Sequence, residues 1–306
     1  MSQDVIFVTG HKNPDTDSIC SAIGYAALKG EGYAAGRAGE LNPETQFVLN
    51  HFGLTAPQLL TDVAGKDVIL VDHNEAGQAV DGISDAKILE ILDHHKIGGL
   101  QTSEPILFCN IPVGCTATIV AMFYHQQGKQ PEPAVAGAMC SAILSDALAF
   151  RSPTCTAQDK ETAQKLAALA GITDIEAYAK EMFVAGSELG NKTEKEILYL
   201  DFKKFTAGGK TFGVGQVTSM SGEELQELKP KMQKYMKESF AEHEADMLFL
   251  MLTDIMDEST DLIYCGEGAD AAVQAAFTSD AVDRTYLKGV MSRKKQIVPQ
   301  LTDALK

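Results

Sequence analysis

Short apolar runs alternate with longer amphipathic stretches along the N-terminal part of the chain. The short runs are rich in β-branched residues and are bounded by glycine or polar residues, a pattern typical of buried strands. They predict strands at residues 4–9, 67–71 and 87–92. The longer stretches, rich in alanine and leucine, predict helices at residues 18–29, 116–125, 134–148, 158–170 and 175–183. This alternation predicts an α/β domain with a mostly parallel sheet that is covered on both faces.

The pattern changes after residues 185–192, a stretch of small and polar residues with two glycines that is typical of a linker. Beyond it, residues 202–212 carry a turn signal, Gly208-Gly209, between strand-like pieces, and the strand continues at 213–218. Further strands are predicted at 247–253 and 262–264, and a charged amphipathic helix at 223–243. The chain is long enough for two domains. We place the boundary near residue 188, with one domain at 1–188, a linker at 189–194 and a smaller α/β domain at 195–306.

The composition is typical of a globular protein, because 45% of the residues are hydrophobic. No run of about 18 apolar residues occurs, so we expect no membrane span. Residues 1–4 lack the basic and then apolar layout of a signal peptide, so we expect a cytoplasmic location. The six cysteines include no C-x-x-C pair, and we expect them to be reduced core residues.

The net charge of −16 argues against a nucleic-acid partner, which requires a positive field. It also disfavours an anionic substrate, unless cations are bound at the site. Bound divalent cations would reverse the local charge, and local charge rather than net charge decides what binds in a cleft.

Acidic and histidine side chains gather where the predicted strands end. They are, in chain order, His11, Asp15, Asp17, Asp72, His94, His95 and Asp146, the last from the end of a predicted helix. Ligands of such sheets bind beyond the carboxyl ends of the strands. Carboxylates and imidazoles suit hard or borderline divalent ions, and one aspartate such as Asp72 can bridge two ions about 3.5–4 Å apart. A single aspartate after a strand is more often a turn or helix cap. Here the residues form four clusters at matched positions, and this favours a binuclear metal site. The clusters lie at residues 10–18, 71–74, 93–96 and 145–146.

Other polar residues have simpler interpretations. His73 and Asp93 flank the ligand positions and are expected to orient ligands. Structural or solvated positions are expected for His51, His125, His243, Asp254, Asp257 and Asp261, the three aspartates in a loop.

A basic cluster, Arg293 to Lys295, lies between apolar Val290 and the apolar pair Ile297 and Val298. We interpret it as a charged run within a buried strand, which requires an anionic partner. Arginine and lysine both suit phosphate oxygens. A further candidate lies just after the linker, and spacing alone does not decide between Lys203 and Lys204.

Together these segments resemble the family II, manganese-dependent inorganic pyrophosphatases of the DHH phosphoesterase superfamily. The resemblance covers essentially the whole chain. Its segments are residues 10–18, 72–75, 93–95, 112–116 and 292–301. The Asp-His-His motif at 93–95 marks the superfamily, whereas Ser-Arg-Lys-Lys-Gln at 292–296 marks the family.

The resemblance implies a role for each matching residue. His11 and Asp15 would bind one manganese ion, and Asp72 would bridge to the second. The second ion would be held by Asp17, His94 and Asp146, and the pyrophosphate by His95, Lys203, Arg293 and Lys294. It also implies an N-terminal DHH domain with a mostly parallel sheet flanked by helices and a smaller DHHA2-type C-terminal domain. A cleft between them would hold the active site, and the N-terminal domain would form a homodimer.

The expected reaction is hydrolysis of pyrophosphate to two phosphates by a water that bridges two manganese ions, with Mg²⁺ arriving with the substrate. The residues expected to take part in catalysis are Asp15, Asp72, His95, Lys203, Arg293 and Lys294. Cobalt would suit the same ligands. The alternatives are a related hydrolase of short polyphosphates or dinucleotides, and a metal-loaded sensor without activity. The intervals between Asp72 and Asp93 and between His95 and Asp146 are too short for the nucleotide-binding CBS insert of regulated members. Thr218 replaces a frequent asparagine, with no expected loss of activity.

Overall fold

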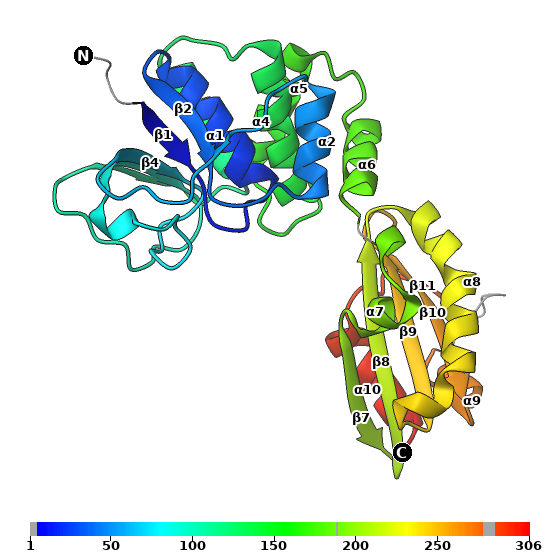
Figure 1. Ribbon diagram of the computed structural model, residues 1–306. Coiled ribbons are helices and arrows are strands. Elements are labelled where there is room, and N and C mark those ends of the chain that lie inside the picture. Colours follow the sequence, from blue (N-terminus) through cyan, green and yellow to red (C-terminus); the bar gives the residue numbers. More distant parts are fainter. Residues whose placement is uncertain (1–4, 188, 278–284) are drawn as a thin grey trace. The chain divides into compact units, whose positions relative to one another are not determined.

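The computed structural model describes residues 5–187, 189–277 and 285–306 (Figure 1). The chain forms two compact units, residues 1–186 and 187–306. Asp4, in the first predicted strand, and Glu188, at the predicted boundary, lie outside the described residues.

The first unit is built from strands followed by helices. Its strands are β1 (Ile6–Thr9), β2 (Tyr33–Arg37), β3 (Gln58–Leu59), β4 (Asp67–Val71), β5 (Lys87–Asp93) and β6 (Leu107–Asn110). Its helices are α1 (Thr16–Lys29), α2 (Pro43–His51), α3 (Thr116–Gln126), α4 (Pro133–Asp146), α5 (Ala157–Ala170), α6 (Ile175–Gly186) and the 3-10 turn η1 (Ile83–Asp85).

Within the described residues, the strands of the first unit form one parallel sheet in the order β3-β2-β1-β4-β5-β6. One face packs against α1 and α3, while α4 packs on these helices and α5 on α4 (Figure 1). On the other face, Val68 and Leu70 of β4 pack against Val63 and Val80 from the flanking loops and Ile83 from η1. The predicted parallel α/β sheet is confirmed.

The second unit contains a mixed sheet. Its strands are β7 (Phe202–Ala207), β8 (Lys210–Ser219), β9 (Met247–Asp254), β10 (Ser259–Gly266) and β11 (Tyr286–Lys288). Its helices are α7 (Glu194–Tyr199), α8 (Gly222–Glu238), α9 (Ala269–Ala276), α10 (Val298–Ala304), the 3-10 turns η2 (Leu189–Asn191) and η3 (Phe240–His243), and the π-helical turn η4 (Arg293–Ile297).

The order of this sheet is β11-β10-β9-β8-β7, in which β8 and β9 are parallel and the other described neighbours are antiparallel. Each face has its own core. Phe212, Phe249 and Leu262 pack with α9 and α10 on one face, whereas Leu250 and Ile263 pack with α7 and α8 on the other. The strands therefore alternate between two buried layers, as central strands of a two-sided sheet do.

Three local predictions in the second unit are wrong. Residues 292–295 do not lie in a buried strand, because the chain forms η4 there and continues into α10. Asp261 is not in a solvated loop; it is buried in β10 and pairs with Lys229 of α8 at 2.8 Å. The charged helix ends at Glu238, so His243 lies beyond it in η3, buried and hydrogen-bonded to Tyr199.

All six cysteines are described and are free thiols. In the part of the chain that the structure covers, no helix combines the length and the apolar character that a membrane crossing requires.

Candidate metal centre

The predicted metal-binding side chains converge at the carboxyl ends of three adjacent strands, β1, β4 and β5. His11 follows β1, Asp72 follows β4, and His94 follows β5. The start of α1 adds Asp15, its N-cap, and Asp17, in its first turn; Asp146 is the last residue of α4. Parallel neighbours bring these ends to one edge of the sheet, so residues up to 135 positions apart in the chain can meet.

One half of the centre consists of His11, Asp15 and Asp72. His11 Nε2 lies 3.5 Å from Asp15 Oδ2 and 3.3 Å from Asp72 Oδ2. His11 Nδ1 lies 2.7 Å from the carbonyl oxygen of Lys12. A carbonyl can only accept, so Nδ1 carries the hydrogen and Nε2 turns toward the carboxylates as a potential ligand.

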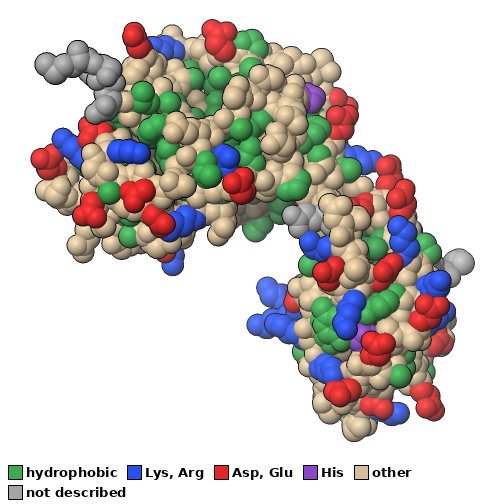
Figure 2. All heavy atoms as spheres, viewed as in Figure 1, with side chains coloured by type: hydrophobic (Ala, Val, Ile, Leu, Met, Phe, Trp, Pro, Cys, Tyr) green, Lys and Arg blue, Asp and Glu red, His purple; other side chains and the backbone are tan. Residues whose placement is uncertain are grey.

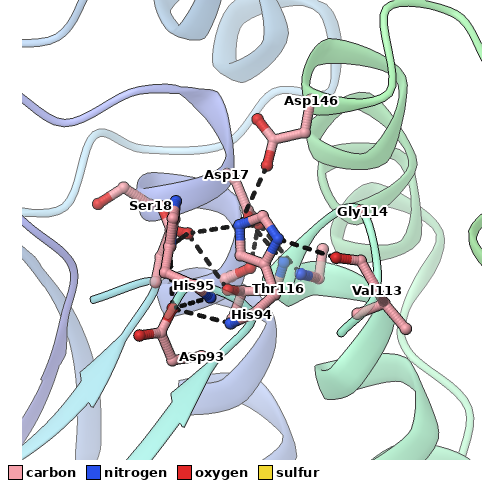
Figure 3. A network of polar contacts seen from close by, with 12 residues as sticks. Asp17, Ser18, Asp93, His94, His95, Val113, Gly114, Thr116 and Asp146 are labelled. Carbon is pink, nitrogen blue, oxygen red and sulfur yellow. Dashed lines mark hydrogen bonds and ion pairs between the residues drawn. The ribbon is translucent and has the colours of Figure 1, made fainter. Parts of the chain in front are cut away.

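The other half is arranged around His94, with Asp17 and Asp146 beside it (Figure 3). His94 Nε2 lies 3.3 Å from Asp72 Oδ1, 3.7 Å from Asp146 Oδ2 and 3.9 Å from Asp17 Oδ2. His94 Nδ1 donates to the carbonyl of Val113 at 3.0 Å. Asp72 thus faces His11 with Oδ2 and His94 with Oδ1, which also lies 3.7 Å from His95 Nδ1, and it is shared by both halves.

The electrostatics of the cluster favour a bound cation. Burial and the charge of Asp72 raise the pKa of Asp17 to about 6. Burial and the charges of Asp17 and Asp72 raise the pKa of Asp146 well above its usual range. Burial alone would lower the pKa of His94, but Asp72 and Asp17 outweigh it and raise the pKa to about 9. These carboxylates repel one another, and divalent cations would remove the repulsion.

The donor atoms also fit a divalent ion of the manganese type. Asp72 Oδ2 and His94 Nε2 are buried and make no hydrogen bond to any described residue. Buried polar atoms of this kind require a partner. His11, Asp15 and Asp72 hold one ligand atom each within 4.8 Å of one another, as do Asp72, His94 and His95. Mixed carboxylate and imidazole donors suit Mn²⁺ and related ions.

The start of α3 holds the carboxylates in place. The backbone amides of Thr116 and Ala117 donate to Asp17 at 2.6 and 3.0 Å, and the Thr116 hydroxyl donates to Asp72 at 3.2 Å. Gly10 is required by close packing, because a Cβ there would lie 1.8 Å from Ser18 Oγ. Gly10 and Thr116 therefore help to position the carboxylates and are not among the proposed ligands.

Backbone strain gathers around the same cluster. Asn13 and Asp72 have positive φ values of 54° and 62°. Shortly after Asp146, residues 148–150 have φ values of 47°, 47° and 71°. Left-handed conformations are unfavourable for residues other than glycine, and they persist where the surrounding structure over-determines them, often at functional sites.

His95 differs from His94 in its exposure, since 55% of its side chain is accessible. Its Nδ1 lies 3.0 Å from Asp93 Oδ1, and this hydrogen bond raises the pKa of His95. Asp93 also accepts from the backbone amides of His94 and His95. Asp93 therefore fixes the turn that carries His94 and His95. On the neighbouring strand end, His73 donates from Nδ1 to the carbonyl of Val71 at 2.9 Å.

Sequence reasoning missed three residues near the centre. The sulfur of Cys115 lies within 4.8 Å of ligand oxygens of Asp17 and Asp146. Glu44 of α2 accepts from the hydroxyls of Thr16 and Ser145, each at 2.6 Å, and so ties together the segments that carry Asp17 and Asp146. Asp159 of α5 binds the loop before α3. Cys115 lies in a segment already singled out. Glu44 carries no local signal, and the spacing of Thr156 and Asp159 signals only the start of α5.

The basic residues of the second unit occupy two faces of its sheet. Phe205 packs on the α10 face and Phe202 on the α8 face, so strand alternation directs Lys203 to the α10 face and Lys204 to the α8 face. Lys204 Nζ lies 3.6 Å from Glu244.

Arg293 is buried, and its guanidinium is held by Asp201, directly before β7, and by β8. It donates to Asp201 Oδ1 at 2.7 Å, to the Asp201 carbonyl, and to the Val214 carbonyl at 3.4 Å. Lys294 is exposed. Of the basic run predicted to lie in a buried strand, Arg293 alone is buried, and its closest anionic partner is Asp201.

Comparison with known proteins shows the family. Residues 5–143 match the model of the DHH family, N-terminal domain, and residues 180–304 match the DHHA2 domain. A Clostridium acetobutylicum protein named "Probable manganese-dependent inorganic pyrophosphatase" is 48% identical, and the alignment covers 99% of each chain. The manganese-dependent inorganic pyrophosphatase of Methanothrix thermoacetophila is 45% identical, again over 99% of each chain.

A solved structure shows the same likeness. It is that of a Methanococcus jannaschii protein assigned to the family II inorganic pyrophosphatases. It is 41% identical, covers 98% of this chain and 99% of its own, and superimposes with a TM-score of 0.63. With both domain models matched and with such relatives aligned over nearly their full length, this chain belongs to the manganese-dependent, family II inorganic pyrophosphatases.

Proposed function

We propose that this protein hydrolyses inorganic pyrophosphate to two phosphates with divalent cations held at the candidate metal centre. The observation that carries the proposal is the position of Asp72, whose two oxygens lie 3.3 Å from His11 Nε2 and from His94 Nε2. A buried carboxylate shared between two ligand sets is the arrangement that a pair of ions requires. The names of the full-length relatives support manganese and pyrophosphate.

The ligand assignment follows the two halves of the centre. His11 and Asp15 would bind one ion, Asp72 would bridge, and Asp17, His94 and Asp146 would bind the other. Two ions per subunit are supported by the number of donors, and cobalt would suit the same set. When bound, such a pair supplies a nucleophile at neutral pH and neutralises charge on phosphate oxygens; Mg²⁺ would accompany the substrate.

The remaining functional side chains would hold the substrate. His95 is exposed, and Asp93 favours its protonated form, which suits a phosphate oxygen. Lys203 lies on the same face of the second sheet as η4, which carries Lys294. This supports Lys203, rather than Lys204, as the residue that would hold the substrate together with Lys294. Arg293 would have to share its donors between Asp201 and the substrate. In this assignment, residues 1–188 supply the metal centre, 195–306 supply the basic side chains, and 189–194 link them.

We propose a homodimer that forms through β6 of the first unit. This strand lies at one edge of the described sheet and exposes Leu107 and Phe108, which are 45% and 40% accessible. An open edge strand with apolar side chains is prone to pair with another strand, and a two-fold axis would pair the β6 strands of two copies.

The remaining expectations concern location and other partners. Figure 2 shows basic side chains in small groups among acidic ones on the visible face, which together with the net charge of −16 supports the absence of a nucleic-acid partner. Six free thiols support the reducing environment of the cytoplasm.

The experiment that tests this function is phosphate release by metal-stripped protein after addition of Mn²⁺ and Mg²⁺. Pyrophosphate, tripolyphosphate and a dinucleotide are compared under the same conditions. We expect fast turnover of pyrophosphate that depends on Mn²⁺. Preferential turnover of tripolyphosphate would assign the protein to short polyphosphates, and no turnover of any substrate would contradict an enzymatic role.

A further inference from the structure

Asp159, in the first turn of α5, is a fully buried carboxylate outside the ligand sets. Its Oδ1 accepts from the hydroxyl of Thr118 at 2.6 Å. Its Oδ2 accepts from the backbone amide of Gly114 at 2.8 Å and from the amide and hydroxyl of Thr156, both at 2.7 Å. The contacts to Thr156 form a capping box for α5, whereas those to Gly114 and Thr118 reach another part of the fold.

Gly114 and Thr118 bracket the backbone that supports the metal centre. Immediately before Gly114, the carbonyl of Val113 accepts from His94 Nδ1 and so sets the tautomer that turns Nε2 toward the carboxylates. Between Gly114 and Thr118, the amides of Thr116 and Ala117 hold Asp17 (Figure 3). One carboxylate thus fixes both ends of a segment that orients a histidine and an aspartate from different elements.

The packing between Asp159 and this segment is tight. A Cβ at position 114 would lie 2.8 Å from Asp159 Oδ2, so only glycine allows the amide to approach the carboxylate this closely. The carboxylate accepts four hydrogen bonds. An amide side chain offers one acceptor oxygen in place of two. Substitution by asparagine would replace one of the two acceptors by an NH2 donor, which disrupts the hydrogen bonds from Gly114 and Thr156 or reverses the one from Thr118.

We propose that Asp159 is a positioning residue of the metal centre, which acts by locking residues 113–118 in the conformation that orients His94 and Asp17. This inference rests on the proposed metal-dependent function. It predicts that Asp159 sets metal affinity beyond its contribution to the stability of α5. The alternative is that Asp159 only caps α5, in which case its loss would lower stability and leave metal affinity unchanged.

Three variants separate the two roles. Asp159→Asn removes the charge and one acceptor. Asp159→Glu keeps a capping box for α5, since glutamate is favoured at this position, but its longer side chain moves the carboxylate relative to Gly114. The matched control is Glu196→Gln, which weakens the same capping box, with Thr193, at the start of α7 in the second unit.

The measurement is Mn²⁺ binding to the full-length, metal-stripped protein, followed by the electron paramagnetic resonance signal of free Mn²⁺ well below each thermal midpoint. For Asp159→Asn we expect a dissociation constant raised by roughly ten- to hundredfold, the range for residues that orient metal ligands. Asp159→Glu should regain thermal stability while its Mn²⁺ affinity stays low. Glu196→Gln should bind Mn²⁺ as the unsubstituted protein does.

Two results would overturn the inference. If both Asp159 variants bind Mn²⁺ with unchanged affinity, Asp159 serves α5 alone, and the metal centre itself stands. If Mn²⁺ affinity and the thermal midpoint change together in the two Asp159 variants, so that Asp159→Glu regains both, the role of Asp159 is again only structural. A failure of the unsubstituted protein to bind Mn²⁺ would instead remove the proposed function together with this inference.

Discussion

Single side chains in the metal centre are oriented by backbone groups that lie elsewhere in the sequence. His11 and His94 use the same device, because each gives its Nδ1 hydrogen to a backbone carbonyl and turns Nε2 toward carboxylates. The residue types at strand ends predict the ligands themselves. They do not predict that Val113 supplies the acceptor or that Glu44 joins two ligand-bearing segments, because only tertiary packing brings these residues together.

Asp72→Asn tests the shared carboxylate. Asparagine tolerates positive φ, so the backbone at this position should be retained. An amide cannot bridge two cations, and we expect Mn²⁺ affinity to fall by more than about a hundredfold, since residues that only orient ligands already cost ten- to hundredfold. Binding is measured by calorimetry and hydrolysis by phosphate release. Asp67→Asn, at the exposed opposite end of β4, is the control and should behave as the unsubstituted protein.

Lys203 and Lys204 form a second matched pair on neighbouring positions of β7. Lys203→Met should lower kcat/KM for pyrophosphate by about ten- to hundredfold, which corresponds to one lost hydrogen bond between charged groups. Lys204→Met should have little effect, because Lys204 lies on the other face and pairs with Glu244. Steady-state kinetics at saturating Mn²⁺ measure both. Equal losses in the two variants would contradict the assignment by strand alternation.

At the level of elements, hydrophobic periodicity predicted the strands that carry ligands and most helices of the first unit. It missed β2, β3 and β6, since strands of two to five residues with alanine, glycine, glutamine or asparagine give little period-two signal. It failed at residues 292–295 because Val290 and Ile297 suit a strand or a helical turn equally, and Pro299 at the start of α10 favours the helix. The charge of Asp261 predicts a solvated loop, but its ion pair with Lys229 of α8 allows it to be buried in β10.

The edge strand β6 allows a test of the proposed dimer. Phe108→Lys places a charge on the edge of the sheet, where it should oppose pairing between copies and shift the protein toward monomer. Leu59→Lys is the control, because Leu59 is 39% exposed on β3 at the opposite edge, a strand of only two residues. Sedimentation velocity over a range of concentrations gives the association state. A dimer that survives Phe108→Lys and dissociates with Leu59→Lys would place the interface at β3.

At the level of the whole molecule, the two units have separate cores and separate chemistry. Every proposed metal ligand belongs to residues 1–186, and Lys203, Arg293 and Lys294 belong to residues 187–306. The sequence predicts this division through its change in pattern near the linker. Metal binding should therefore stabilise the unit that carries the ligands.

Hydrogen exchange with and without Mn²⁺ measures this difference in the intact chain. A ligand that binds only the folded state adds RT ln(1 + [L]/Kd) to the free energy of unfolding, about 2.7 kcal/mol for each ion at a hundred times its Kd. Core amides of β4 and β5 should then exchange more slowly by about a hundredfold per bound ion, because they open only when the unit unfolds. Core amides of β8 and β9 should keep their rates. Equal slowing of exchange in both sheets would mean that the two units unfold together and would contradict the prediction. The control is Asp72→Asn, in which Mn²⁺ should not slow the exchange of β4 and β5 amides if the effect arises at the metal centre.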